Sequence, residues 1–305
     1  MFSGEPTNRA VSSNLEGMSL RPVRRIHNAV RDDIADLTTR RAMPTASINS
    51  IDPFLFLNHH GPQTYGSPNH GLPFGPHPHR GFETVTFILE GDIAHSDTGG
   101  HESIIEAGGV QWMTAGSGLV HMESSSAAFK KRGGGMECLQ LWVNLPASLK
   151  MTKPRYIGLQ RQHIPEIHED GVTIRAISGH WGKAKPAIEP LYDIAIAEVY
   201  FDAGAGRTFT IAAGRNIFFY VVRGNVEVNG QGAQQFQLVE FGTEGTEIAV
   251  TAHSAAMILL GHAVPFNEPV VAHGPFVMNT RDEIVAAFED YQQGKFGLPQ
   301  DLSPA

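Results

Sequence analysis

A pattern of short apolar runs, ended by glycine, occurs twice in this chain and limits the folds that it can adopt. Residues 84–91 (TVTFILEG) have a counterpart in residues 217–224 (IFFYVVRG), and residues 106–108 (EAG) have one in residues 240–242 (EFG). Short apolar runs between turn residues are typical of strands. Because both pairs occur in the same order, the sequence predicts a duplicated β-barrel.

Two strand-rich blocks carry this pattern, over residues 48–146 and 172–263. Strands are expected at residues 54–57, 84–89, 138–143, 218–222, 226–228 and 257–260. No stretch of the first block keeps a helical period for the length of a helix. One helix is expected after the second block, where Thr280 and Glu283 form a capping-box pattern. Its apolar face contains Ile284, Val285, Phe288 and Tyr291, and it should end near Gly294.

The predicted fold class is therefore all-β, with two barrels in tandem and a short C-terminal helix. Residues 1–20 are polar and lack periodicity, so a flexible tail is expected there. Residues 21–160 are assigned to the first barrel, and residues 161–305 to the second barrel with the helix at its end. Within the first barrel, residues 21–41 mix six arginines with three aspartates, which is typical of a solvated face.

Composition excludes several classes of protein. The formal net charge of −8 gives no general attraction to nucleic acid. No signal-peptide or membrane-spanning run is found, so neither secretion nor membrane insertion is expected. The single cysteine, Cys138, cannot form an internal disulfide and is expected to be a small packed core group. We therefore expect a cytoplasmic protein.

Histidine is the residue type that points to chemistry. His77 and His79 are two residues apart, as are His121 and Glu123, and residues at this spacing in a strand point to the same face. Two adjacent strands can thus bring four ligands together. Three imidazoles and one carboxylate suit a divalent transition metal and leave room for water, substrate or oxygen. Iron, manganese, cobalt, nickel, copper and zinc all accept such ligands.

The other histidines of this block do not follow the same logic. His59 and His60 are adjacent and would point to opposite faces of a strand, whereas His70, His95 and His101 have no partner at a suitable spacing. We interpret all of them as loop or hydrogen-bonding residues.

Four longer motifs carry a resemblance to a known family. Residues 77–86 (HPHRGFETVT), 111–121 (QWMTAGSGLVH), 141–146 (LWVNLP) and 274–281 (GPFVMNTR) resemble the pirin family of the cupin superfamily. The resemblance extends over about residues 21–298. It implies two cupin barrels, a non-haem iron, most simply Fe(II), in the first barrel, and ligands at His77, His79, His121 and Glu123.

One alternative for the carboxylate ligand stays open. In the wider cupin pattern a glutamate follows the His-x-His pair by a few residues, and Glu83 occupies about that place. By strand parity Glu83 would share the face of His77 and His79. We favour Glu123 as the ligand and expect Glu83 to support a ligand's free ring nitrogen.

The second barrel shows no equivalent ligand set. When its repeat is aligned with the first, Thr210 and Ala212 fall opposite His77 and His79, and Ala255 and Met257 fall opposite His121 and Glu123. It is therefore expected to hold no metal and to serve packing or partner contacts.

Two functions follow from the resemblance. In the first, the chain is a quercetin 2,3-dioxygenase-like enzyme that binds a flavonol and O2, with Glu123 accepting the flavonol's hydroxyl proton. In the second, the iron changes its oxidation state and thereby alters the affinity for a protein partner, which makes the chain a redox sensor or regulator. The sequence does not separate these two hypotheses.

Overall fold

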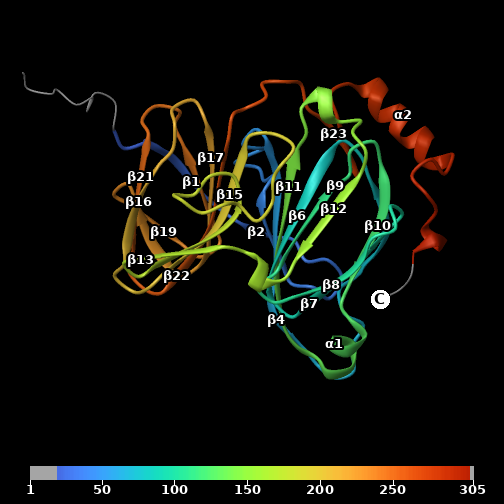
Figure 1. Ribbon diagram of the computed structural model, residues 1–305, viewed down its shortest axis with the longest axis horizontal. Coiled ribbons are helices and arrows are strands. Elements are labelled where there is room, and N and C mark those ends of the chain that lie inside the picture. Colours follow the sequence, from blue (N-terminus) through green and yellow to red (C-terminus); the bar gives the residue numbers. More distant parts are fainter. Residues whose placement is uncertain (1–18, 303–305) are drawn as a thin grey trace, which may run out of the picture.

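The chain folds into two β-barrels that lie side by side in the computed structural model, which describes residues 19–302 (Figure 1). Each barrel contains one seven-stranded sheet and one four-stranded sheet, and the paired strands within these sheets are antiparallel. The predicted fold class is confirmed. The expected tail lies outside the described residues except for Ser19 and Leu20, and Leu20 forms a bridge with Glu247.

The first barrel contains strands β2 to β12. Its large sheet has the order β12 (Arg155–Leu159), β9 (Val110–Thr114), β6 (Phe82–Glu90), β11 (Gly134–Asn144), β4 (Phe54–Tyr65), β3 (Thr39–Met43) and β2 (Val30–Arg31). Its small sheet has the order β5 (Phe74–His79), β10 (Leu119–Ser124), β7 (Asp92–Asp97) and β8 (Glu102–Glu106).

The second barrel repeats this arrangement. Its large sheet has the order β1 (Val23–Asn28), β20 (Gln237–Phe241), β17 (Asn216–Arg223), β22 (Ala256–Ala263), β15 (Ile194–Phe201), β14 (Val172–Ser178) and β13 (Glu166–Glu169). Its small sheet has the order β16 (Gly206–Thr210), β21 (Glu247–Ala252), β18 (Asn225–Val228) and β19 (Gln231–Gln234). The six strands expected from apolar runs lie within β4, β6, β11, β17, β18 and β22.

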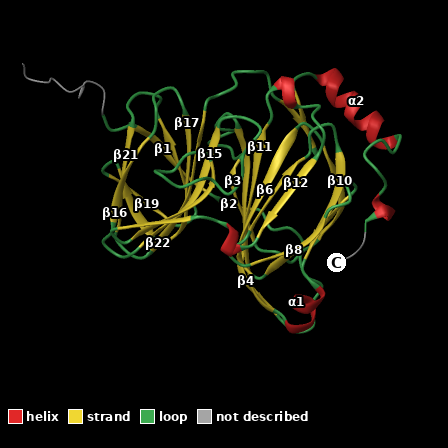
Figure 2. Ribbon diagram, in the orientation of Figure 1, coloured by secondary structure: helices red, strands yellow, loops and turns green. Residues whose placement is uncertain are grey.

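The helices are short and few among the described residues (Figure 2). Helix α2 (Arg281–Gln292) begins at the predicted capping box, in which the side chain of Thr280 accepts a hydrogen bond from the backbone N–H of Glu283. Of its expected apolar face, Ile284 is buried but Val285 is exposed. Helix α1 (Ala127–Arg132) was not predicted, because six residues are too few to show a period. Three 3-10 turns occupy Ala147–Leu149, Arg161–His163 and Pro299–Asp301. Neither α1 nor α2 is long and apolar enough to cross a bilayer.

The two large sheets pack against each other and form the main core between the barrels. On β17, Phe218, Tyr220 and Val222 belong to this shared core, whereas the alternate residues Ile217, Phe219 and Val221 fill the second barrel. Since both faces of the strand are buried, its sequence is a continuous apolar run. The same alternation on β11 directs Leu139 and Leu141 toward the second barrel. Gln140 and Trp142 therefore face the interior of the first barrel.

Both ends of the chain depart from the expected division at residue 160. Strand β1 pairs with β20 and so completes the second barrel, although it lies within residues 21–160. The C-terminal hairpin of β23 (Val271–His273) and β24 (Phe276–Met278) and helix α2 pack on the first barrel, where Phe276 shares a core with Val120 (Figure 1). A linear boundary cannot describe such an exchange, because each terminal segment covers apolar surface of the opposite barrel.

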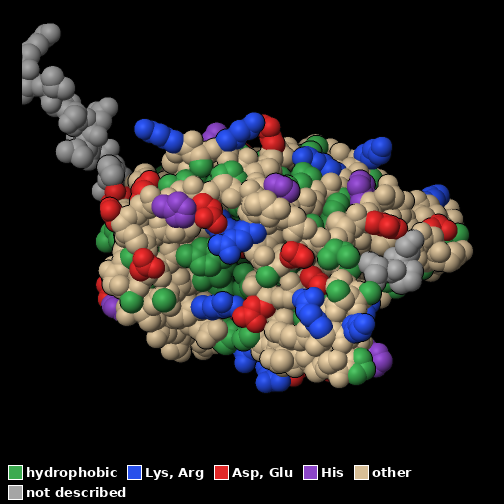
Figure 3. Space-filling model, turned by 60° about the horizontal axis from the view of Figure 1, so that its bottom comes forward, with side chains coloured by type: hydrophobic (Ala, Val, Ile, Leu, Met, Phe, Trp, Pro, Cys, Tyr) green, Lys and Arg blue, Asp and Glu red, His purple; other side chains and the backbone are tan. Residues whose placement is uncertain are grey.

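The charged surface is mixed. On the face shown in Figure 3, basic and acidic side chains are interleaved, so that face carries no field of a single sign. Within residues 21–41, the pairs Arg31–Asp33 (2.8 Å) and Arg41–Asp32 (2.6 Å) agree with the expected solvated face. Arg21 does not: its guanidinium is buried and donates to the carbonyls of Arg215 (2.7 Å) and Ala212 (3.0 Å).

Candidate metal centre

The two histidine motifs lie on adjacent strands inside the first barrel. His77 and His79 are on β5 and His121 is on β10, with His121 directly opposite His77 in the antiparallel register. The ring centroids are 4.3 Å apart for His77 and His121, 4.9 Å for His79 and His121, and 4.8 Å for His77 and His79. The ligand atoms of the three rings lie within 4.8 Å of one another. The structure thus brings together the three imidazoles that the spacing indicated.

Backbone carbonyls orient two of the three rings. His77 Nδ1 donates to the carbonyl oxygen of Gly75 at 2.7 Å, and His79 Nδ1 donates to that of Pro275 at 3.2 Å. A hydrogen on Nδ1 leaves the lone pair on Nε2, which is the atom that can bind a metal. The Pro275 contact comes from the C-terminal hairpin, so a distant segment of the chain orients a predicted ligand.

His121 is the central ring of the cluster. It is buried, and neither ring nitrogen has a hydrogen-bond partner among residues 19–302. Burial lowers the pKa of His121 and of His79 well below the ordinary value, and the neighbouring imidazoles lower both further. Rings that stay neutral keep lone pairs, and a buried polar group without a partner is costly. These residues therefore fit a divalent transition metal.

Glu123 follows on the same strand, after a bulge between it and His121. Its carboxylate is buried and accepts hydrogen bonds from Gln140 Nε2 (2.8 Å), Thr86 Oγ1 (3.4 Å) and Gln111 Nε2. All three donors are neutral, so they hold the carboxylate without cancelling its charge. One carboxylate oxygen of Glu123 and one ring nitrogen each of His121 and His95 lie within 4.8 Å of one another. Glu123 therefore adjoins the histidine cluster at His121.

Glu83 does not face the cluster, and the expectation that it supports a ligand's ring nitrogen is wrong. It accepts hydrogen bonds from Thr114 Oγ1 (2.6 Å) and from Tyr192 Oη (3.1 Å), which belongs to the segment before β15. Its neighbour Val85 is part of the core between the barrels. Gly81, at φ 87°, turns the chain between β5 and β6, so the alternation of faces does not continue from His79 to Glu83.

The remaining histidines fall into two groups. His59 and His60 point to opposite sides as expected: His59 contacts Tyr220 (3.0 Å) and Glu137 (2.8 Å), whereas His60 contacts Thr39 (2.8 Å). His95 was missed. It is buried, lies on β7 opposite Glu123, and forms a second group of possible ligands with His121 and Glu123. The signal was that His95 and Asp97 are two positions apart, which is the spacing within each pair of predicted ligands.

The second barrel has a filled interior. Phe209, Phe219, Ile248 and Leu260 are among the residues that pack there. In the first barrel, Cys138 is buried among Ile88, Phe129 and Met136, as expected for a packed core group. Burial raises the pKa of its thiol.

Comparison with known proteins identifies the family. The family model for pirin matches residues 36–143, and that for the pirin C-terminal cupin domain matches residues 196–297. The chain belongs to the pirin family. Its two barrels are therefore cupin domains, and all four predicted ligands lie within the matched residues 36–143.

Individual pirin relatives are similar over most of the chain. A pirin-like protein of Caulobacter vibrioides is 39% identical over 285 residues, which cover 92% of this chain and 100% of the relative. Human pirin is 36% identical over 268 residues, covering 85% and 88%. A crystal structure of a quercetin 2,3-dioxygenase from Acinetobacter baumannii superposes with a TM-score of 0.83 at 32% identity, covering 92% of this chain and 99% of that one.

Proposed function

We propose that this chain is a metal-dependent dioxygenase that opens the ring of a flavonol such as quercetin, with iron as the metal. The observation that carries the proposal is the convergence of His77, His79 and His121 inside the barrel, where buried His121 has no partner for either ring nitrogen in the described part of the chain. Three imidazoles with Glu123 beside them leave coordination positions free for substrate and oxygen. The similarity to a quercetin 2,3-dioxygenase supports the substrate class.

The metal would be held by His77, His79, His121 and Glu123. When bound, it supplies a Lewis acid for a chelating substrate and a redox centre for the reaction with O2. The hydrogen bonds from the Nδ1 atoms of His77 and His79 to backbone carbonyls fix the tautomers of these two rings. Both rings therefore keep Nε2 free for the ion.

Glu123 accepts the hydroxyl proton of the flavonol as the substrate binds. It is suited to this role because Gln140 and Gln111 orient its two oxygens and because its donors are neutral. A general base must lie within hydrogen-bond reach of the proton that it takes, and a carboxylate beside the metal meets this condition.

Aromatic side chains enclose the cluster on one side. The rings of Phe82 and Trp142 lie 5.0 Å and 5.4 Å from the ring of His79. Such walls limit the access of water, and they offer flat apolar surface to an aromatic substrate. In the proposed reaction both atoms of O2 enter the opened product, and one carbon of the substrate leaves as carbon monoxide.

Oxygen uptake and flavonol loss, measured together, test the proposal. For the iron-loaded protein we expect the two to be consumed in a one-to-one ratio, and we expect His121→Ala to lose both with its metal. An iron-loaded protein that consumes none of several flavonols would refute the dioxygenase. That result would favour the regulatory hypothesis, which predicts partner binding that depends on the oxidation state of iron.

A further inference from the structure

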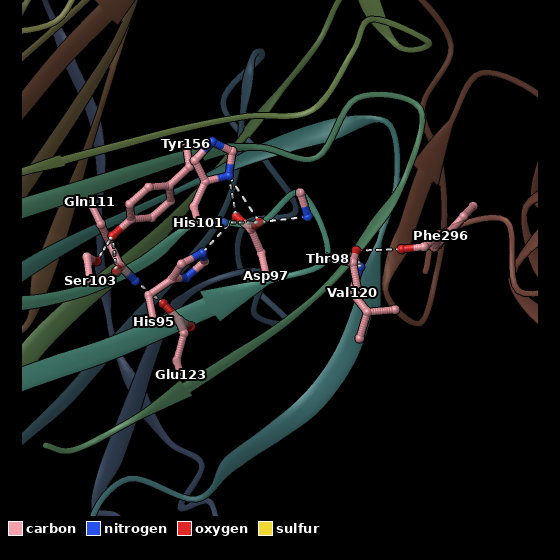
Figure 4. Close-up of polar contacts among 11 residues, drawn as sticks. His95, Asp97, Thr98, His101, Ser103, Gln111, Val120, Glu123, Tyr156 and Phe296 are labelled. Atoms are coloured by element: carbon pink, nitrogen blue, oxygen red, sulfur yellow. Dashed lines mark hydrogen bonds and ion pairs between the residues drawn. The ribbon is translucent and has the colours of Figure 1, made fainter. Parts of the chain in front are cut away.

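His95 is a buried imidazole beside the candidate metal centre for which the proposed function has no role. It lies on β7, directly opposite Glu123 on β10. Its ring centroid is 5.5 Å from that of His121, and one of its ring nitrogens lies within 4.8 Å of the ligand atoms of His121 and Glu123. Figure 4 shows His95 and Glu123 side by side.

Asp97 determines which nitrogen of His95 carries the hydrogen. Asp97 Oδ2 lies 3.0 Å from His95 Nε2, while Oδ1 accepts the backbone N–H groups of Gly99 (2.8 Å) and His101 (3.2 Å). A carboxylate is only an acceptor, so His95 Nε2 must donate to it. The lone pair of the neutral ring is then on Nδ1, which is buried and has no hydrogen-bond partner among the described residues.

The ring is also fixed in orientation. It stacks on Tyr156 with the centroids 4.1 Å apart and the planes at 13°. The hydroxyl of Tyr156 is held by Ser103 (2.5 Å) and donates to Gln111 Oε1 (3.2 Å), and Gln111 in turn donates to Glu123 (Figure 4). One network thus positions the free nitrogen of His95 and the carboxylate of Glu123 together.

We propose that His95 Nδ1 accepts a hydrogen bond from a hydroxyl group of the molecule bound beside the metal, with Asp97 as its positioning residue. This deepens the proposed function and rests on it, because flavonols carry several hydroxyl groups. A buried acceptor of this kind selects for a hydroxyl, since an analogue without it leaves the nitrogen unpaired.

Asp97→Asn provides a sharp test because it should move one hydrogen atom. The amide oxygen of asparagine can keep the Oδ1 contacts with Gly99 and His101, which places the NH2 group against His95 Nε2. That nitrogen must then accept, and the ring hydrogen moves to Nδ1. His95 would thereby change from an acceptor to a donor toward the site, while the predicted metal ligands stay the same.

The experiment measures quercetin affinity, metal content and the His95 tautomer in full-length protein. For Asp97→Asn we expect iron content equal to wild type and a quercetin Kd raised roughly 10- to 100-fold, the range for an unpaired buried hydrogen-bonding group. Nitrogen-15 NMR of the zinc-loaded protein should show the hydrogen on Nδ1. His95→Phe, which keeps the stack on Tyr156, should weaken quercetin binding to a similar extent and retain iron. The ring of His101 also contacts this carboxylate, with Nδ1 3.1 Å from Asp97 Oδ1. His101→Gln removes that imidazole and serves as the control with unchanged affinity.

Two results would overturn the assignment of His95. One is an unchanged quercetin Kd in Asp97→Asn once NMR shows that the hydrogen has moved. The other is loss of iron in His95→Phe, which would make His95 a metal ligand. Failure of the dioxygenase proposal looks different: wild type would bind quercetin without oxygen uptake, and the His95 contact would stand. Iron-loaded wild type that does not bind quercetin refutes both.

Discussion

Replacing His121 with leucine should stabilise the metal-free protein and remove most of the stabilisation that the metal provides. In the wild type this side chain is 1% exposed, and neither of its nitrogens has a hydrogen-bond partner within residues 19–302. An unpartnered buried polar group costs about 1–3 kcal/mol. Leucine is apolar and of similar size, so the metal-free variant should exceed the metal-free wild type in unfolding free energy by roughly that amount.

The metal should change this order. A ligand that is present at 1,000 times its Kd and binds only the folded state adds about 4 kcal/mol. With an unfolding entropy of about 2.1 cal/mol/K per residue, the 305 residues give about 0.6 kcal/mol/K, and the Tm of wild type should rise by about 6 °C. The Tm of His121→Leu should rise little when the metal is added.

Differential scanning calorimetry, with chelator and with excess ferrous iron, measures both effects. His70→Leu is a suitable control, because His70 is exposed and its variant should keep the full metal-induced rise. An equal metal-induced rise in Tm in His121→Leu and wild type would show that His121 does not hold the metal. A metal-free variant that unfolds several degrees below metal-free wild type would show that the buried ring is stabilising on its own.

Three further predictions concern single residues. Glu123→Gln should weaken iron binding at least tenfold while Glu83→Gln leaves it unchanged; metal titration decides, and the reverse order would make Glu83 the ligand. Burial raises the pKa of Glu83, so its contribution to stability is complete below about pH 4.5 and is lost as pH rises through the folded-state value. Urea unfolding from pH 5 upward should show this fall in wild type but not in Glu83→Gln, and parallel curves would contradict it. Lys150→Met should lower the free energy of unfolding, measured in urea, by about 2–4 kcal/mol. The reason is that buried Nζ donates to Gly81 O (2.8 Å), Asn144 Oδ1 (2.6 Å) and Val277 O (3.0 Å). A loss below about 0.5 kcal/mol would contradict the role of these bonds.

The sequence was informative where chemistry follows a local period. Spacing by two residues placed His77 and His79 on one strand face, and the register of β5 with β10 then brought His121 beside them. The capping box of α2 and the strands of both barrels are equally local signals. Each needs only the residues within one element.

Long-range features were not predictable in this way. The pairing of β1 with β20 and the packing of Phe276 on Val120 depend on which apolar surface a terminal segment covers. The orientation of Glu83 depends on the turn at Gly81, where strand parity cannot be carried across. His95 enters the site only because β7 pairs with β10, and no pattern within β7 states which strand lies beside it.

X-ray absorption at the iron edge reports on the metal's ligands themselves, because multiple scattering counts the imidazoles bound to the metal. For protein loaded with one iron we expect three imidazoles, from His77, His79 and His121, with oxygen from Glu123 and solvent in the remaining positions. His121→Leu that still takes up iron should show two. A count of one or none in wild type, or a spectrum that His121→Leu does not change, would contradict the assignment of the metal centre.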